Sequence, residues 1–165
     1  MNTRTVASKT PWRASALLLT LAGITLVGMG VYFTALRPPL LPEDIRFMQL
    51  SAAEAASIGP RLASWLTHVF RVLGGYAAAT GLLAIALAAT AYRDRRPLAI
   101  LGVVLGGMSS IGLMAVVNFA IDSDFRWLLL GFATLWASSL IACWIEAGAS
   151  RPQPFTAPTP KGNEP

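Results

Sequence analysis

Residues 98–121 read LAILGVVLGGMSSIGLMAVVNFAI, an apolar run that contains no Lys, Arg, Asp or Glu. About 20 helical residues cross the apolar core of a bilayer, so this run is long enough to span a membrane. Three other stretches share this property: residues 14–36, 72–92 and 127–145. Because consecutive spans cross in opposite directions, the sequence predicts an all-α, polytopic membrane protein, an antiparallel bundle of four transmembrane helices.

The composition leaves little of the chain outside these spans. Of its 165 residues, 55% are hydrophobic and 13% are charged, whereas soluble proteins average about 25% charged residues. We therefore predict a single bundle over residues 14–146 and no separate catalytic domain. A formal net charge of +5 could indicate a nucleic-acid binder. The chain has no long basic run, however, so we expect membrane lipids and not nucleic acid as its partners.

The charges outside the spans fall into two unequal groups. One side of the membrane collects eight basic and three acidic residues, a net charge of +5, and the other side collects five of each. Cytoplasmic loops carry the excess of Lys and Arg, so the first side, which includes the short turn at residues 92–97, is predicted to be cytoplasmic. We expect a multi-pass protein of the bacterial inner membrane. Residues 1–13 and a Pro-rich, disordered tail at residues 147–165 would then lie in the cytoplasm.

The start of the chain also has features of a secretory signal, because basic residues precede an apolar run. The apolar part of such a signal is normally about 7–15 residues long. The run at residues 14–36 is longer and has no small-residue cleavage site, so we expect it to be an uncleaved first span. Cleavage after this run is the alternative.

The loop after the first span, residues 37–67, contains two helix-start signals. Pro-Glu-Asp at residues 42–44 is typical of a helix start, since acidic side chains favour the positive end of the helix dipole. Ser51 and Glu54 have the spacing of a capping box. The sequence therefore predicts one short helix over residues 43–50 and a second that begins after Ser51.

A long helix is predicted to follow, over residues 61–92. At a rise of about 1.5 Å per residue it would be about 48 Å long, more than the apolar core of about 30 Å, so part of it should project from the membrane. Arg61, Ser64, His68 and Arg71 recur at helical intervals and form one polar stripe on this helix.

His68 and Arg71, together with Asp122 and Asp124 of the loop between the third and fourth spans, form the candidate polar site. Ionisable groups at membrane depth are candidates for a ligand or proton site. The alternative is a structural role near the lipid headgroups, in which Arg71 forms a salt bridge with Asp122 or Asp124. We favour the structural role.

Small residues in the third span predict close helix packing. Gly102, Gly106 and Ser110 recur every four residues, which allows a neighbouring helix to approach closely. We expect this ridge to pack inside the bundle, and a homodimer face is the alternative. Trp136 should lie at the same depth, where its indole N–H needs an acceptor. We expect Ser109 or Ser110 to accept that hydrogen bond.

No pattern in the sequence is typical of catalysis or of a bound cofactor. The chain has neither the Gly-x-Ser-x-Gly motif of hydrolases, nor a phosphate-binding loop, nor a His-Glu metal motif. Its single cysteine and single histidine exclude an internal disulfide and a two-histidine metal site within one chain. We therefore expect no cofactor and no metal.

The second predicted span begins Arg-Val-Leu-Gly-Gly-Tyr at residues 71–76, with Gly81 and Leu82 beyond it, after a short outer segment. In this the chain resembles small bacterial four-helix inner-membrane proteins, including DoxX-like proteins. The resemblance implies a four-helix membrane fold and carries over no catalytic residue.

The leading hypothesis is a non-enzymatic structural or accessory protein whose outer loop contacts lipid, a membrane-protein partner or a second copy. The alternative is an oligomeric transporter or channel subunit that uses His68, Arg71 and Asp122, and an enzyme acting on a lipid headgroup is the third hypothesis. A water-accessible cavity that reaches Ser109 and Trp136 would favour transport, whereas a filled bundle would favour the accessory role.

Overall fold

The structure is a computed structural model that describes residues 13–149, and this part of the chain is almost entirely helical. Four helical segments are long and apolar enough to cross a membrane: Ala14–Leu36, Pro60–Ala89, Pro97–Ala120 and Arg126–Ala149. The prediction of an all-α fold with four membrane-spanning helices is confirmed. The last segment continues past residue 147, where a disordered tail was predicted to begin, so this boundary is wrong. The remainder of the predicted tail and residues 1–12 lie outside the described residues.

The first span consists of α1 (Ala14–Val31) and the π-helical turn η1 (Tyr32–Leu36), and the second span is part of α4 (Pro60–Ala89). Between them lie the short helices α2 (Pro42–Phe47) and α3 (Ala52–Ser57). The third span consists of α5 (Pro97–Gly107), the π-helical turn η2 (Met108–Gly112) and α6 (Leu113–Ala120), and the fourth is α7 (Arg126–Ala149).

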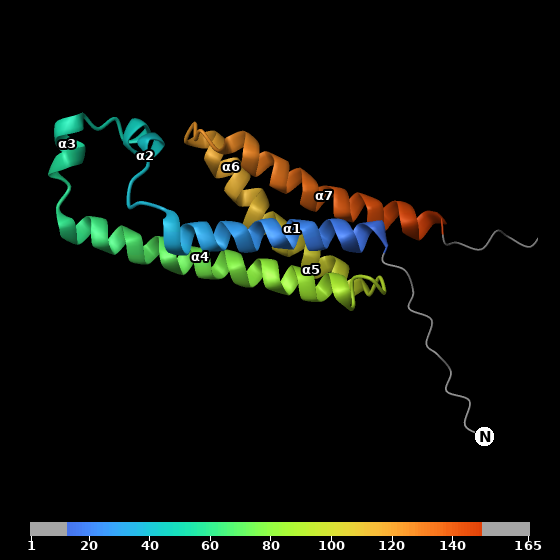
Figure 1. The fold of residues 1–165 in the computed structure, drawn as a ribbon. Coiled ribbons are helices and arrows are strands. Elements are labelled where there is room, and N and C mark those ends of the chain that lie inside the picture. The colour runs from blue at the N-terminus through green and yellow to red at the C-terminus, as the bar shows by residue number, and fades with distance from the viewer. Residues whose placement is uncertain (1–12, 150–165) are drawn as a thin grey trace, which may run out of the picture.

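The helices give the molecule two ends (Figure 1). The turn end holds the start of α1, the α4–α5 turn at residues 90–96 and the end of α7. The loop end holds η1, α2, α3, the start of α4 and the α6–α7 turn at residues 121–125. α1 lies antiparallel to both α4 and α7, so it is the central helix of the bundle.

α1 and α4 pack through glycines that recur every seven residues on both helices. A Cβ added to Gly81 would lie 2.5 Å from the carbonyl oxygen of Gly23, and one added to Gly74 would lie 2.6 Å from that of Gly30. Distances this short leave no room for any side chain. The antiparallel register therefore pairs glycine with glycine at two levels and brings the two backbones into contact.

The third span packs mainly against α7, and its contact face differs from the predicted one. Trp136 of α7 is buried, and a Cβ added to Gly107 would overlap its indole ring. Added Cβ atoms at Gly102 and Gly106 would meet nothing within 4 Å. The Gly102–Gly106–Ser110 ridge was expected to pack inside the bundle, but its glycines make no such contact. The glycine that does is Gly107, one residue further along the helix than Gly106. The homodimer face at this ridge stays a prediction.

The predicted acceptor of the Trp136 indole is also wrong. Its N–H donates to the carbonyl oxygen of Val103 at 3.0 Å. The Ser109 and Ser110 hydroxyls donate instead to carbonyl oxygens of their own helix, those of Leu105 and Gly106 respectively. A serine in an apolar helix most directly donates its hydroxyl to a backbone carbonyl of the preceding turn. It therefore needs no hydrogen bond with the tryptophan.

At the turn end, polar contacts join α1 to α7. The carboxylate of Glu146 accepts hydrogen bonds from the backbone N–H and the hydroxyl of Ser15, at 3.1 and 2.8 Å. Arg95 lies 3.6 Å from the same carboxylate. The fully buried Tyr92 donates its hydroxyl to the carbonyl oxygen of Ser139 at 2.8 Å. These contacts fix the ends of the spans where the bundle meets the α4–α5 turn.

Candidate functional site

The loop end is organised around Arg37, the first residue after η1. Its guanidinium lies 3.4 Å from the ring centroid of Phe70 in α4 and 5.5 Å from that of Phe33 in η1. One of its nitrogens donates to the carboxylate of Asp44 in α2 at 2.9 Å. The arginine side chain is only 7% exposed. A guanidinium combines stacking on aromatic rings with directed hydrogen bonds, so this one residue joins the first span, α2 and α4.

Asp44 has a second role at the start of α2. The same carboxylate oxygen that pairs with Arg37 accepts a hydrogen bond from the backbone N–H of Leu41 at 2.9 Å. Pro42 occupies the first helical position, where no N–H is needed. The sequence therefore forms the predicted short helix, although it ends at Phe47 and not at residue 50.

Two further contacts fix α2 against the α6–α7 turn. Glu43 is only 4% exposed, and its carboxylate accepts a hydrogen bond from the hydroxyl of Ser123 at 3.3 Å. Arg46 donates to the carboxylate of Asp124 at 3.0 Å and to the carbonyl oxygen of Asp122 at 2.8 Å. The Arg46–Asp124 pair is well exposed, so it orients the loop more than it stabilises it.

The second short helix, α3, is capped as predicted. The Ser51 hydroxyl accepts a hydrogen bond from the backbone N–H of Glu54, whose carboxylate accepts one from the backbone N–H of Ser51 at 2.8 Å. The hydroxyl of Ser51 also donates to this carboxylate at 2.6 Å. These bonds hold the pKa of Glu54 below its usual value, because they stabilise the charged carboxylate.

The four residues of the predicted polar site are not brought together. Asp122 pairs with Arg126, four residues further along the chain, and Asp124 pairs with Arg46. His68 bonds through Nδ1 to the carbonyl oxygen of Ser64 at 2.7 Å. Among the residues that the structure describes, Arg71 forms no ion pair with either aspartate. The predicted salt bridge of Arg71 is therefore wrong, because nearer arginines take both aspartates.

Large apolar side chains remain exposed around these paired charges. Phe47 and Met48 at the end of α2 are 59% and 45% exposed. On the first turns of α4, Leu62 and Trp65 are 48% and 60% exposed. We call these four residues the loop-end apolar residues. Exposed apolar groups of this size are typical of surfaces that meet lipid or another protein.

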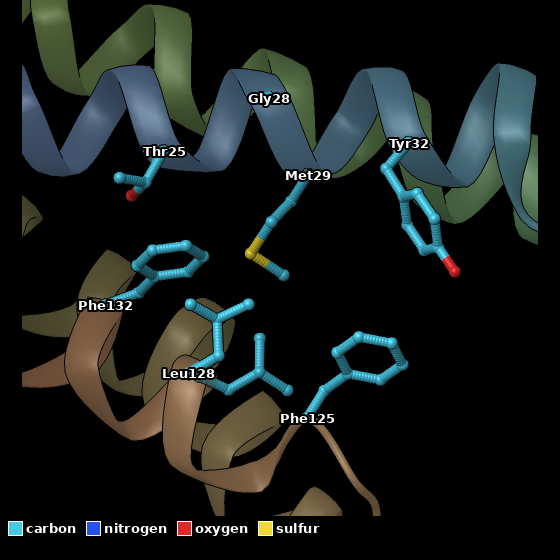
Figure 2. A pocket seen from close by; sticks show the side chains of 8 residues that line it. Thr25, Gly28, Met29, Tyr32, Phe125, Leu128 and Phe132 are labelled. Atoms are coloured by element: carbon cyan, nitrogen blue, oxygen red, sulfur yellow. The ribbon is translucent and has the colours of Figure 1, made fainter. Parts of the chain in front are cut away.

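Grooves lined mostly by apolar side chains lie between the spans. The first, of about 370 Å³, lies between α1 and α7 (Figure 2). Figure 2 shows Met29 of α1 pointing toward Leu128 and Phe132 of α7, with Tyr32 and Phe125 at the loop end of the groove.

The second groove, of about 440 Å³, lies between α4 and the third span. Its polar side chains donate to carbonyl oxygens of their own helices: Thr80, Ser109, Ser110 and Asn118. Trp136 lines a separate groove on the α7 side of the third span. Ser109 and Trp136 thus line two different grooves, whereas the transport alternative expected one cavity that reaches both.

Within residues 13–149, no group of three or more His, Cys, Asp or Glu side chains is arranged to hold a metal ion. Searches of protein-family models, curated proteins and solved structures find no match to this chain. The resemblance to DoxX-like proteins therefore stays a prediction, and the function must be argued from the molecule alone.

The residues that organise the loop end were not singled out from the sequence. Arg37, Phe70 and Ser123 come from three separate segments, and Glu43 was expected only to favour the start of a helix. One signal was present: an arginine directly after an apolar span, with an aspartate seven residues later and prolines between them. That pattern favours a return of the chain onto its own helix end.

Proposed function

We propose that the chain is a non-enzymatic accessory protein of the bacterial inner membrane, whose loop end contacts lipid or a membrane-protein partner. The observation that carries this proposal is that every acidic side chain of the loop end already has a protein partner. Those side chains are Glu43, Asp44, Glu54, Asp122 and Asp124, with Ser123, Arg37, Ser51, Arg126 and Arg46 as their respective partners. Carboxylates engaged in this way position the loop and are not free for acid–base chemistry.

The loop-end apolar residues support the second part of the proposal. The polar contacts of α2 fix it to the bundle, while Phe47 and Met48 point out of those contacts and stay exposed. Holding an exposed apolar surface in place lowers the entropic cost of binding, since the surface is already ordered. The loop end would thus serve as a prearranged contact surface at the membrane interface.

Photo-crosslinking in native membranes tests this role. A photoreactive residue at Phe47 should give a defined adduct, and the adduct should be lost when Arg37→Ala releases α2. The matched control is Trp144, which is 79% exposed at the turn end and should give only generic lipid adducts. The same adducts at both positions would contradict the proposal, and ion or solute flux in vesicles containing the purified protein would favour the transporter.

We also propose that both termini lie in the cytoplasm and the loop end outside it. The support is the charge asymmetry: the side of the turn end carries eight basic and three acidic residues, and the side of the loop end carries five of each. Ser57 and Arg96 are both exposed, at opposite ends of the bundle. In a Cys143→Ala background, a membrane-impermeant thiol reagent added to intact cells should label Ser57→Cys and spare Arg96→Cys. The reverse pattern would overturn this orientation.

A further inference from the structure

A small polar pocket lies at the turn end, on the opposite side of the bundle from the loop end. It has a volume of about 270 Å³ and lies between the start of α1 and the end of α4. Its lining consists of Arg13, Ala89, Thr90, Arg93 and Asp94. This lining sets it apart from the grooves between the spans, whose walls are mostly apolar.

Arg13 gives the pocket its chemistry. One terminal nitrogen of its guanidinium, Nη1, is buried and has no hydrogen-bond partner among the described residues. Glu146 of α7 is near enough for its charge to interact with that of Arg13, but its carboxylate oxygens are engaged by Ser15 and Arg95. A buried N–H of a charged group without an acceptor destabilises the fold, so the site favours an external oxygen acceptor.

The charge around the pocket favours an anion. The described residues of the turn end carry four arginines, Arg13, Arg93, Arg95 and Arg96, against two acids, Asp94 and Glu146. The N-terminal end of α1, which bears a partial positive charge, lies beside Arg13, and its Ser15 N–H is already engaged by Glu146. The carboxyl end of α4 bears the opposite partial charge, but its carbonyl groups already accept bonds from the turn, such as Leu87 from Tyr92 and Thr90 from Asp94.

We propose that this pocket binds a phosphate group, either that of an anionic phospholipid or free phosphate. A guanidinium fork matches two phosphate oxygens, which is why arginine is common in phosphate sites. The pocket also lies where α1 enters its apolar span, the level of the lipid headgroups. Basic pockets between membrane helices at this level are typical sites for anionic lipids. Asp94, which also lines the pocket, opposes binding and sets a limit on the affinity.

Native mass spectrometry of the full chain in detergent tests the proposal with phosphatidylglycerol, phosphatidylcholine and inorganic phosphate as probes. The wild type should retain phosphatidylglycerol about tenfold better than phosphatidylcholine, and Arg13→Gln should lose most of that preference. Arg71→Gln removes the same charge from an exposed site at the loop end and should retain the preference. Asp94→Asn removes the opposing charge, so this variant should bind phosphatidylglycerol several-fold more tightly than the wild type. This second test does not depend on whether the Arg13 variant folds.

The outcomes separate the two sources of phosphate. Retention of phosphatidylglycerol that excess inorganic phosphate cannot displace would assign the pocket to a lipid headgroup. Displacement by inorganic phosphate, with the same loss in Arg13→Gln, would assign it to free phosphate. Equal retention of both lipids together with no binding of inorganic phosphate would overturn the proposal. An equal loss of lipid preference in Arg13→Gln and Arg71→Gln would also overturn the proposal. The preference would then depend on the net charge of the protein and not on this pocket.

Discussion

α1 and the third span are both apolar and rich in glycine, yet they pack in different ways. In the most apolar stretch of the first span, which is mainly α1, 39% is buried, whereas in that of the third span 22% is buried. Gly23 and Gly30 of α1 meet glycines of α4 backbone to backbone. In the third span, Gly107 meets the side chain of Trp136, and Gly102 and Gly106 meet no neighbour. Glycine therefore brings two backbones into contact in the first region. In the second it makes room for one side chain at Gly107 and leaves the surface at Gly102 and Gly106 open to lipid or a partner.

The largest expected effect comes from filling the α1–α4 contact. Gly81→Leu places a side chain against the backbone of Gly23, which cannot move aside, so we expect the free energy of unfolding to fall by more than about 3 kcal/mol. Gly106→Leu is the matched control in the third span and should cost little. Unfolding by SDS in mixed micelles measures both variants. Equal losses at the two positions would erase the distinction between the two regions.

The next effect concerns Arg37, which joins the ends of α1 and α4. Arg37→Ala removes the ion pair with Asp44 and the contact with Phe70, leaving a carboxylate that is 20% exposed without its cation. We expect a loss of about 3 kcal/mol in the same unfolding measurement. Arg71→Ala, the control, removes an exposed arginine of α4 and should change stability by less than about 0.5 kcal/mol. If Arg71→Ala cost as much, Arg71 would have a partner at this end after all.

The four spans and the capping box were predictable from the sequence because each depends on a local pattern. Charge-free runs of the right length define spans, and Ser51 and Glu54 satisfy each other's backbone within one turn. The packing of the third span was not predictable in this way. Whether Gly106 or Gly107 faces a neighbour depends on a helix rotation of about 100°, which only the position of α7 determines.

The candidate site failed for a related reason. A salt bridge of Arg71 with Asp122 or Asp124 was predicted only because these residues were expected at a similar depth in the membrane. A shared depth does not determine which arginine lies nearest to each aspartate. Arg126 and Arg46 take the two aspartates, the first from the same turn of chain and the second through the return of α2. The seven-residue spacing of Gly74 and Gly81 was visible in the sequence, but their partners could be identified only once the register of two helices was known.

A smaller effect tests how firmly the third span is held to α7. Trp136→Phe keeps an aromatic ring but removes the N–H that donates to Val103 and part of the buried indole, so we expect a loss of at least about 1 kcal/mol in SDS unfolding. Trp144→Phe, in the same helix but exposed, should be nearly neutral. No difference between the two variants would indicate that neither the hydrogen bond nor the full size of the indole is needed to hold the third span.

The smallest expected effect is a pH-dependent change in the local stability of α3. This helix lies in the loop that connects α1 and α4 but takes no part in their contact. The hydrogen bonds from Ser51 lower the pKa of Glu54 in the folded state, so its charged form favours the capped helix. This contribution is fully present above the ordinary pKa of Glu54 and is lost as the pH falls through the lowered, folded value. Amide hydrogen exchange over residues 51–58 should therefore accelerate in acid, after correction for the intrinsic rate.

Glu54→Gln separates this local effect from a general response to acid. Glutamine can accept the same bond from the backbone N–H of Ser51 without titrating, so exchange in α3 of that variant should not depend on pH in this range. Exchange in the α1–α4 contact should stay constant in both proteins, because that contact is formed by glycine backbone and not by ionisable groups. If acid loosened both regions together, the cap of α3 would be coupled to the packing of α1 on α4. The loop would then be part of the same folding unit as the two helices that it joins.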